Sequence, residues 1–192
     1  MAAATYSTLN MEGVDINNVF YLDTKTLEYP APPFIAGTQA FGTDGSAWVY
    51  CTSSVSLGIG AVCVVSEVPG SWSVALIGGG TIAATAAPIG DLVGVVSGSQ
   101  GSLVVGAPSG TQTGAYFWLQ RAGNCQALNT AASTTKDAQL FSSATVAGRV
   151  SSSGGGVGTT YTINGMVVSQ ATGSTAGPNT AVLNWPTVGS SF

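Results

Sequence analysis

The sequence predicts an all-β protein: an antiparallel β-sandwich or barrel with an extended N-terminal arm and a C-terminal hairpin and tail. Three observations predict this class. Apolar runs flank turn-forming pairs such as Asp44-Gly45 and Asn164-Gly165, residues 72–76 alternate between larger apolar and small side chains, and glycine occurs 27 times in 192 residues. Short strands separated by turns are typical of antiparallel folds, and the straight-chain residues that stabilise exposed helices are scarce.

Residues 1–36 are expected to form an extended arm. Five of the twelve charged residues lie within the first 28 positions, and the proline-rich stretch Tyr29-Pro30-Ala31-Pro32-Pro33-Phe34 follows them. Proline fixes φ and favours extended polyproline geometry. Helical spacing occurs here only at Ile16, Val19 and Phe20, and the other candidate helix is Ala131–Phe141.

Residues 37–150 are predicted to form the β domain. Asp44-Gly45 predicts a hairpin, because both residues tolerate positive φ, and Pro69-Gly70 supplies another turn. Period-2 alternation then places Trp72, Val74 and Leu76 on one face of a half-buried strand. Further strands are expected at Leu92–Val96, Leu103–Val105, Tyr116–Gln120 and Thr145–Val150.

Residues 151–192 are expected to comprise a glycine- and serine-rich linker, a β-hairpin and a tail. Asn164-Gly165 lies between two apolar runs within residues 161–168 and predicts a two-residue turn. A strand is expected at Thr180–Asn184, and Trp185 and Phe192 fall in the predicted tail.

Composition argues against several classes of function. The chain has no histidine, which removes Ser-His-Asp and Cys-His nucleophile systems and imidazole zinc sites, and its net charge of −4 disfavours nucleic-acid binding. Glu67 and Asp91 are the only acids without a simpler role, and neither Lys25 nor Lys136 lies in a catalytic motif. We therefore predict no enzymatic activity, no cofactor and no metal. No secretory signal or membrane span is expected either.

The three cysteines are expected to be free thiols of a protein made in a reducing cytoplasm. Cys51, Cys63 and Cys125 form an odd set without a CxxC motif, and Cys63 lies inside an apolar run. A Cys51–Cys63 disulfide is the alternative.

Aromatic residues and the scarcity of charge point to subunit contacts. Tyr116-Phe117-Trp118 places rings on both faces of one strand, so one face is expected to pack against something outside the domain's own core. Charged residues make up only 6% of the chain, which suits a surface that partners cover. The expected interface residues are Tyr29, Pro32, Pro33, Phe34, Trp118, Trp185 and Phe192.

Two segments resemble patterns in small structural proteins of tailed bacteriophages. The first is Gly37-Thr38 with Phe41–Tyr50 and Gly58–Val65, which is similar to a hairpin followed by a short strand in those proteins. The second is Gly114–Gly123, followed by Asp137–Leu140 and Thr145–Val150. Together they cover roughly residues 37–150. Gln39 and Ala47 depart from the commoner residues of the pattern.

The resemblance implies a capsid decoration, or cement, protein. Such proteins are β-rich, often trimeric, and bound outside the major capsid lattice, so the implied partners are the major capsid protein and further copies of the chain, and the implied location is the virion surface. One alternative is a carbohydrate-binding module of a virion or cell surface that uses Trp118 and Trp72 as stacking platforms. Another is a tail or baseplate subunit of the virion.

Overall fold

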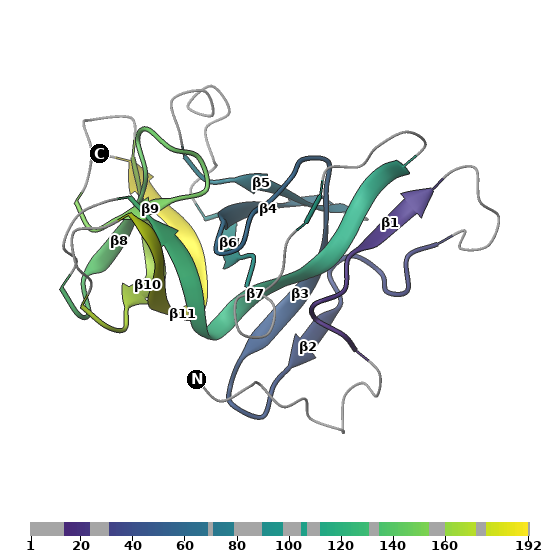
Figure 1. Ribbon diagram of the computed structural model, residues 1–192, viewed down its shortest axis with the longest axis horizontal. Coiled ribbons are helices and arrows are strands. Elements are labelled where there is room, and N and C mark those ends of the chain that lie inside the picture. Colours follow the sequence, from purple (N-terminus) through teal and green to yellow (C-terminus); the bar gives the residue numbers. More distant parts are fainter. Residues whose placement is uncertain are drawn as a thin grey trace.

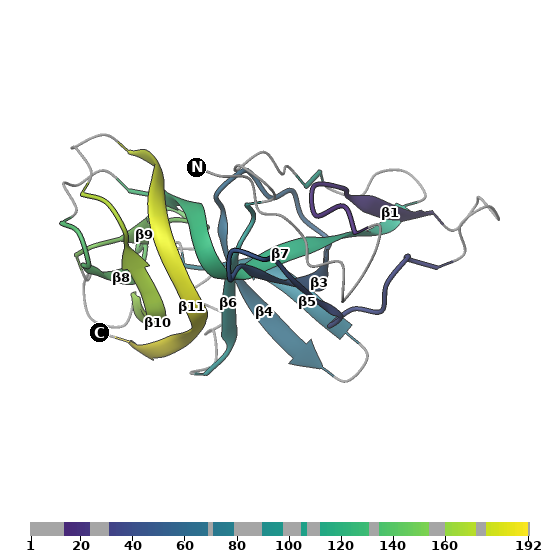
Figure 2. The same ribbon diagram turned by 90° about the horizontal axis from the view of Figure 1, so that it is seen from below.

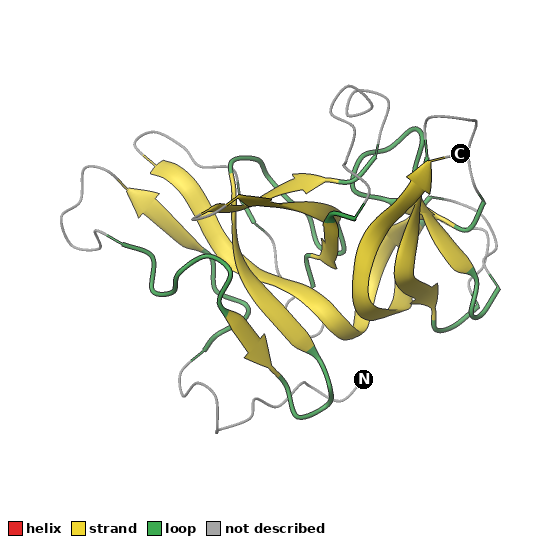
Figure 3. Cartoon of the chain, turned by 180° about the vertical axis from the view of Figure 1, so that it is seen from behind, coloured by secondary structure: helices red, strands yellow, loops and turns green. Residues whose placement is uncertain are grey.

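The computed structural model describes residues 14–23, 31–68, 71–78, 90–97, 105–106, 112–130, 135–153, 160–171 and 176–191. Within these ranges the chain is all β and contains no helix, which confirms the predicted class (Figure 3). The strands form one mixed sheet of eleven, in the order β1-β7-β9-β8-β10-β11-β6-β4-β5-β3-β2. Their bounds are β1 Phe20–Asp23, β2 Gln39–Phe41, β3 Ala47–Ser53, β4 Val62–Val68, β5 Ser71–Leu76, β6 Leu92–Val95, β7 Gln112–Asn129, β8 Gln139–Ser142, β9 Val150–Ser151, β10 Tyr161–Val168 and β11 Gly177–Ser191.

Residues 62–65 of β4 and the neighbouring strand β6 are buried on both faces. Val62 and Val64 of β4 belong to one apolar cluster, shared with β8, β10 and β11, whereas Cys63 and Val65 belong to a second cluster, shared with β3 and the first half of β7. Figure 2 accordingly shows β4 and β6 between these two groups of strands. Burial on both faces explains why residues 61–65 form a continuous apolar run instead of alternating.

Strand β7 joins the two groups (Figure 1). Its first half pairs with β1 and β3, and its second half, from Ala122 to Asn129, pairs with β11. The strand changes partners around Gly123, whose φ is +88°, and the side chain of Gln120 donates hydrogen bonds to the carbonyl oxygens of Ala122 (3.0 Å) and Asn124 (2.9 Å). The prediction of Tyr116–Gln120 found only part of this strand.

The β2–β3 hairpin confirms the predicted turn at Asp44-Gly45. Gly42 donates its N–H to the carbonyl of Ser46, and the carboxylate of Asp44 accepts hydrogen bonds from the backbone N–H and hydroxyl of Ser46. Strands β4 and β5 also pair as predicted, although Pro69 and Gly70 lie outside the described residues. Trp72, Val74 and Leu76 share the face that packs on the second cluster.

The Asn164-Gly165 turn was predicted wrongly. Strand β10 continues through both residues, and the hairpin is formed by β10 and β11 as whole strands. Asn164 pairs with Thr187 and Met166 with Leu183, so Gly165 faces three residues of β11, Asn184-Trp185-Pro186. The positive φ that suggested a turn, +78° at Gly165, instead accommodates this bulge.

Two further expectations need correction, and a third is described only in part. The strand expected at Thr145–Val150 is not formed. Residues 144–148 are bends and turns, and only Val150, together with Ser151, belongs to a strand, β9. The candidate helix at Ala131–Phe141 is not found in its described part: residues 139–141 belong to strand β8, and residues 131–134 lie outside the described ranges. The helical spacing of Ile16, Val19 and Phe20 forms no helix either, and Phe20 begins strand β1. Of the strand expected at Leu103–Val105, only Val105 is described, and it bridges Leu57.

The C-terminal segment lies within the sheet. Residues 177–184 of β11 pair with β7, and Thr187 pairs with Leu92 of β6. Trp185, expected in a tail, therefore lies at the point where β11 passes from one partner strand to another. Among the described residues, no helix has the length and apolar character that crossing a membrane would require.

Candidate interaction surface

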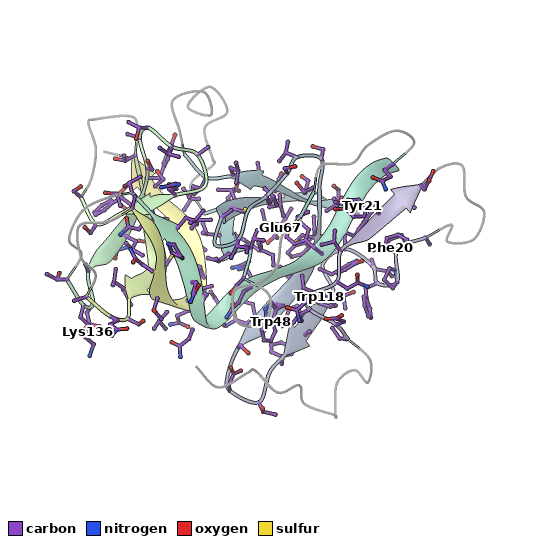
Figure 4. The ribbon with its side chains drawn as sticks, viewed as in Figure 1. Phe20, Tyr21, Trp48, Glu67, Trp118 and Lys136 are labelled. Carbon is purple, nitrogen blue, oxygen red and sulfur yellow. The ribbon has the colours of Figure 1, made fainter. Side chains whose placement is uncertain are left out.

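The aromatic face of β3 and β7 is covered by the chain's own N-terminal segments. Trp48, Tyr50 and Trp118 form a third buried cluster with Val14 and Ile16, and Figure 4 shows Trp48 and Trp118 next to each other beside β2 and β3. The prediction that Tyr116–Trp118 places rings on both faces of its strand is confirmed, but the subunit contact expected at Trp118 is not what covers that ring. What covers the second face is the polypeptide that precedes the β domain.

Phe34 is the aromatic residue of the N-terminal segments that packs on this face of β3 and β7. Its ring packs edge-on against Tyr50 (centroids 5.4 Å apart) and Trp118 (5.2 Å apart). Trp118 is only 1% exposed, so within the folded chain its ring is available neither to a sugar nor to a protein partner. Trp72, the other proposed stacking platform, is partly buried against the second cluster and beside Gly37.

The remaining expected interface residues have different environments. Tyr29 and Phe192 lie outside the residues whose side chains are described; Pro32 is half-buried, and Pro33 is exposed. Trp185 is 42% exposed, and among the expected interface aromatics that the structure describes it alone presents a large surface to solvent. Its φ of +48° is unusual for a residue with a bulky side chain, and such backbone strain marks sites worth functional attention.

The guanidinium group of Arg121 packs against one face of the Trp185 ring. Its guanidinium carbon lies 5.6 Å from the ring centroid, and Nη2 donates a hydrogen bond of 3.3 Å to the carbonyl of Pro186. The arginine is 2% exposed, its Nε has no hydrogen-bond partner among the described residues, and burial lowers its pKa. A cation beneath an aromatic ring contributes roughly 0.5–2 kcal/mol, which helps to fix the orientation of the indole.

Phe41 completes an exposed aromatic pair. It is 40% exposed on β2, and its ring centroid lies 6.5 Å from that of Trp185, with the planes inclined at 52°. The two residues are 144 positions apart in the chain (185 − 41), so only the fold brings them together. We call Phe41 and Trp185 the aromatic pair.

Sequence reasoning missed the most exposed apolar side chain of the described residues. Ile35 is 82% exposed, next to the inward-facing Phe34. Its turn is firmly held, because the backbone N–H of Thr38 (3.0 Å) and its hydroxyl (2.6 Å) both donate to the carbonyl of Ile35. The other exposed large apolar residues are Phe41, Val55, Ile59, Val146 and Trp185.

Of the acidic residues singled out by sequence, Glu67 lies on strand β4 and Asp91 directly precedes strand β6. Glu67 is exposed and pairs in register with Trp72, and Asp91 precedes β6, where partial burial raises its pKa. Continuing the register of Val65 with Leu92 places Asp91 opposite Ser66, so Glu67 belongs to the other face of its strand. Among the described residues, no group of three or more acids and cysteines is arranged to hold a metal.

All three cysteines are free and buried, which confirms the expectation of thiols. Burial raises the pKa of the Cys125 thiol to about 12 and also raises the pKa values of Cys51 and Cys63, so these groups stay protonated and unreactive in the folded protein.

Comparison of the chain with models of known protein families and with curated protein sequences finds no match.

Proposed function

We propose that this protein is a decoration, or cement, protein of a tailed-bacteriophage head. In this proposal it binds the outer surface of the major capsid lattice as a homotrimer, stabilises contacts between capsid subunits, and catalyses no reaction. A partner bound in many copies tolerates weak individual contacts, since avidity multiplies them.

The observation that carries the proposal is an exposed surface with few charges that presents several large apolar side chains, Ile35, Phe41, Val55, Ile59, Val146 and Trp185. Three basic and six acidic residues lie in the described ranges, and one of the basic residues, Arg121, is buried. Lys136 lies at the opposite end of the long axis from Phe20 (Figure 4). Exposed apolar side chains on such a surface favour protein contacts, and weak self-repulsion permits dense packing of copies.

The two segments that carry the resemblance to phage proteins support the same function. The first contains residues 47–50 of β3, and the second contains most of the first half of β7. These stretches pair with each other, with Tyr50 opposite Trp118 and Val49 opposite Leu119. Phe41–Tyr50 and Gly114–Gly123 therefore lie side by side in the sheet, which supports reading them as parts of one pattern.

The test is to image heads of the phage that carries this gene, produced with and without the protein. We expect additional density outside the capsid lattice, with three copies around each local axis, only when the protein is present. Heads that lack it should lose their contents at a lower temperature, and adding the purified folded protein should restore their resistance.

The same images test the alternatives. Density confined to the tail or baseplate would replace the proposal with a tail subunit, and virions without the protein at any position would overturn a structural role.

A further inference from the structure

We propose that Asn164 is a site of spontaneous covalent modification in the folded protein. The backbone nitrogen of Gly165 attacks the side-chain carboxamide of Asn164, which is thereby converted to a carboxylate. These two residues are the one Asn-Gly pair of the sequence, and they form a bulge of β10 instead of the expected turn. The inference goes beyond the proposed function and concerns the chain alone, so it does not depend on capsid binding.

The reaction needs no reactant other than water. The nitrogen of Gly165 gives up its proton to solvent and forms a bond to Cγ of Asn164, the bond from Cγ to Nδ2 breaks, and ammonia leaves. The product is a cyclic succinimide. Water then opens either of its carbonyl groups, which gives aspartate when the bond from Cγ to the nitrogen breaks and isoaspartate when the original peptide bond breaks. Glycine favours ring closure because it has no side chain to crowd the attacking nitrogen.

The pairing of β10 is interrupted at this point on both of its sides. Toward β8, the register jumps from Ile163 to Val167, so the described part of β8 offers residues 164–166 no partner. Toward the described part of β11, the bulge leaves Gly165 unpaired. Regular pairing on both sides would hold the backbone extended and keep the nitrogen of Gly165 away from the Asn164 side chain. The double interruption removes that restraint.

Both reacting residues are accessible to water, and the carboxamide has space to turn. Asn164 and Gly165 are exposed, whereas Ile163 and Met166 on either side are fully buried and keep β10 in place. The carboxamide lies over Gly189 of β11, where a Cβ atom would be 2.8 Å from Nδ2 and 3.2 Å from Oδ1 of Asn164. Because Gly189 has no side chain, nothing at that position presses the carboxamide into one orientation.

The other pair of this kind in the chain, Asp44-Gly45, has the opposite setting. The carboxylate of Asp44 accepts hydrogen bonds from the backbone N–H (3.0 Å) and the hydroxyl of Ser46. The N–H of Gly45 donates to the carbonyl of Gly42 (3.2 Å). These contacts hold both reacting groups, and an ionised carboxylate is a poor target for a nucleophile. Ring closure is therefore expected at Asn164 and not at Asp44.

The modification adds negative charge to a chain whose net charge is −4 and whose described surface carries few charges. Isoaspartate also lengthens the backbone by one CH2 group, at a bulge that already interrupts the register, so the strands beyond it can stay paired. Each chain thus changes its charge with age while it remains folded.

The experiment incubates the full-length folded protein in mildly alkaline buffer and follows each asparagine by peptide mapping with mass spectrometry. Chromatography separates the aspartate and isoaspartate forms. We expect Asn164 to react roughly tenfold or more faster than Asn124 and Asn184, which are also exposed but precede the bulkier Cys125 and Trp185. Both product forms should appear, because the ring opens at either carbonyl group.

The same measurement in urea separates the effect of structure from that of sequence. In the folded protein, Asn164 should react within about tenfold of its rate in the unfolded chain, because a locally unpaired segment opens at little cost in free energy. A folded chain that keeps Asn164 intact while the unfolded chain loses it would overturn the inference, since the paired strands would then protect the site.

Two variants provide controls. Asn164→Gln should block the modification at this position, because its ring would need an additional atom. Asn124→Gln, a matched change at another exposed asparagine, should leave the rate at Asn164 unchanged. Circular dichroism checks that both variants are folded. Reaction of Asn164 no faster than that of Asn184, or aspartate formed without isoaspartate, would also overturn the inference.

Discussion

Two glycines with positive φ, Gly45 and Gly165, differ in how much space their surroundings leave for a side chain. Gly165 and Gly45 have nearly equal φ values, +78° and +80°, but different surroundings. A Cβ atom on Gly165 would lie 2.6 Å from the carbonyl oxygen of Asn184 and 3.3 Å from the Cα of Pro186, whereas nothing lies within 4 Å of the corresponding position on Gly45. Position 165 therefore requires glycine both because its φ is positive and because the backbone of β11 leaves no room for a Cβ atom.

Gly165→Ala is therefore expected to destabilise the protein more than Gly45→Ala. Positive φ costs an alanine about 1–2 kcal/mol at either site. The backbone clash at position 165 should add roughly 1–3 kcal/mol, because neither neighbour is a flexible side chain. Urea unfolding of both variants measures the difference. Equal losses of stability would show that β10 and β11 separate easily at this bulge.

Phe34 and Ile35 show that neighbouring positions in the chain can have opposite environments. Phe34 is directed into the third cluster, and Ile35 is directed to solvent. Phe34 was expected to contact another subunit because it lies at the end of the proline-rich stretch of the predicted arm. Only its packing against Tyr50 and Trp118 shows that it stabilises its own chain.

At the scale of elements, the described residues before position 37, 14–23 and 31–36, pack on the β domain. Strand β1 pairs with β7 from Phe20 to Asp23, and the hydroxyl of Tyr21 accepts a hydrogen bond of 3.0 Å from the N–H of Gly106. Removing residues 1–30 to test a role in capsid binding would therefore also remove β1 and Ile16. A loss of binding by that deletion would not separate docking from folding.

Point variants separate the two effects. Phe34→Ala should destabilise the chain by about 2–3 kcal/mol, because it removes two ring contacts from a partly buried side chain. Ile35→Ala, one residue away, should change the stability by no more than about 0.5 kcal/mol at concentrations too low for self-association. Thermal or urea unfolding checks both, and a neutral Phe34→Ala would mean that the N-terminal cover contributes nothing to folding.

For the whole molecule, the buried thiols predict how stability changes at high pH. The ordinary thiol pKa is 9.0, and burial raises that of Cys125 to about 12. Above about pH 9 the unfolded chain loses thiol protons that the folded chain retains, so the free energy of unfolding falls as pH rises. Cys51 and Cys63 act in the same direction, as does Tyr50 at still higher pH.

Each thiol should lower the stability by about 1.4 kcal/mol per pH unit once it ionises in the unfolded chain. Unfolding measured from pH 7 to pH 11 checks this slope. Cys125→Ala should have a shallower slope above pH 9, and the shape of its curve below pH 8 should match that of the wild-type chain. A stability independent of pH up to 11 would contradict the burial of these thiols.

The class of fold and several strands could be predicted because they depend on local patterns. Asp44-Gly45 forms its hairpin with hydrogen bonds within five residues, and the alternation at Trp72, Val74 and Leu76 needs only one buried face. Asn164-Gly165 carried the same local signal and was misread, because positive φ serves a bulge as well as a turn. Which of the two forms depends on the partner strand.

By itself, the sequence determined that this is a β protein with few charges and no histidine chemistry, since these properties follow from composition and from neighbouring residues. Only the tertiary structure decided that the three cysteines are free. It also decided which aromatic rings are buried and which are exposed. Trp118 is covered by a segment more than eighty positions earlier, and Trp185 meets Phe41 across the fold. Burial depends on contacts between distant parts of the chain, and a local pattern carries no record of those contacts.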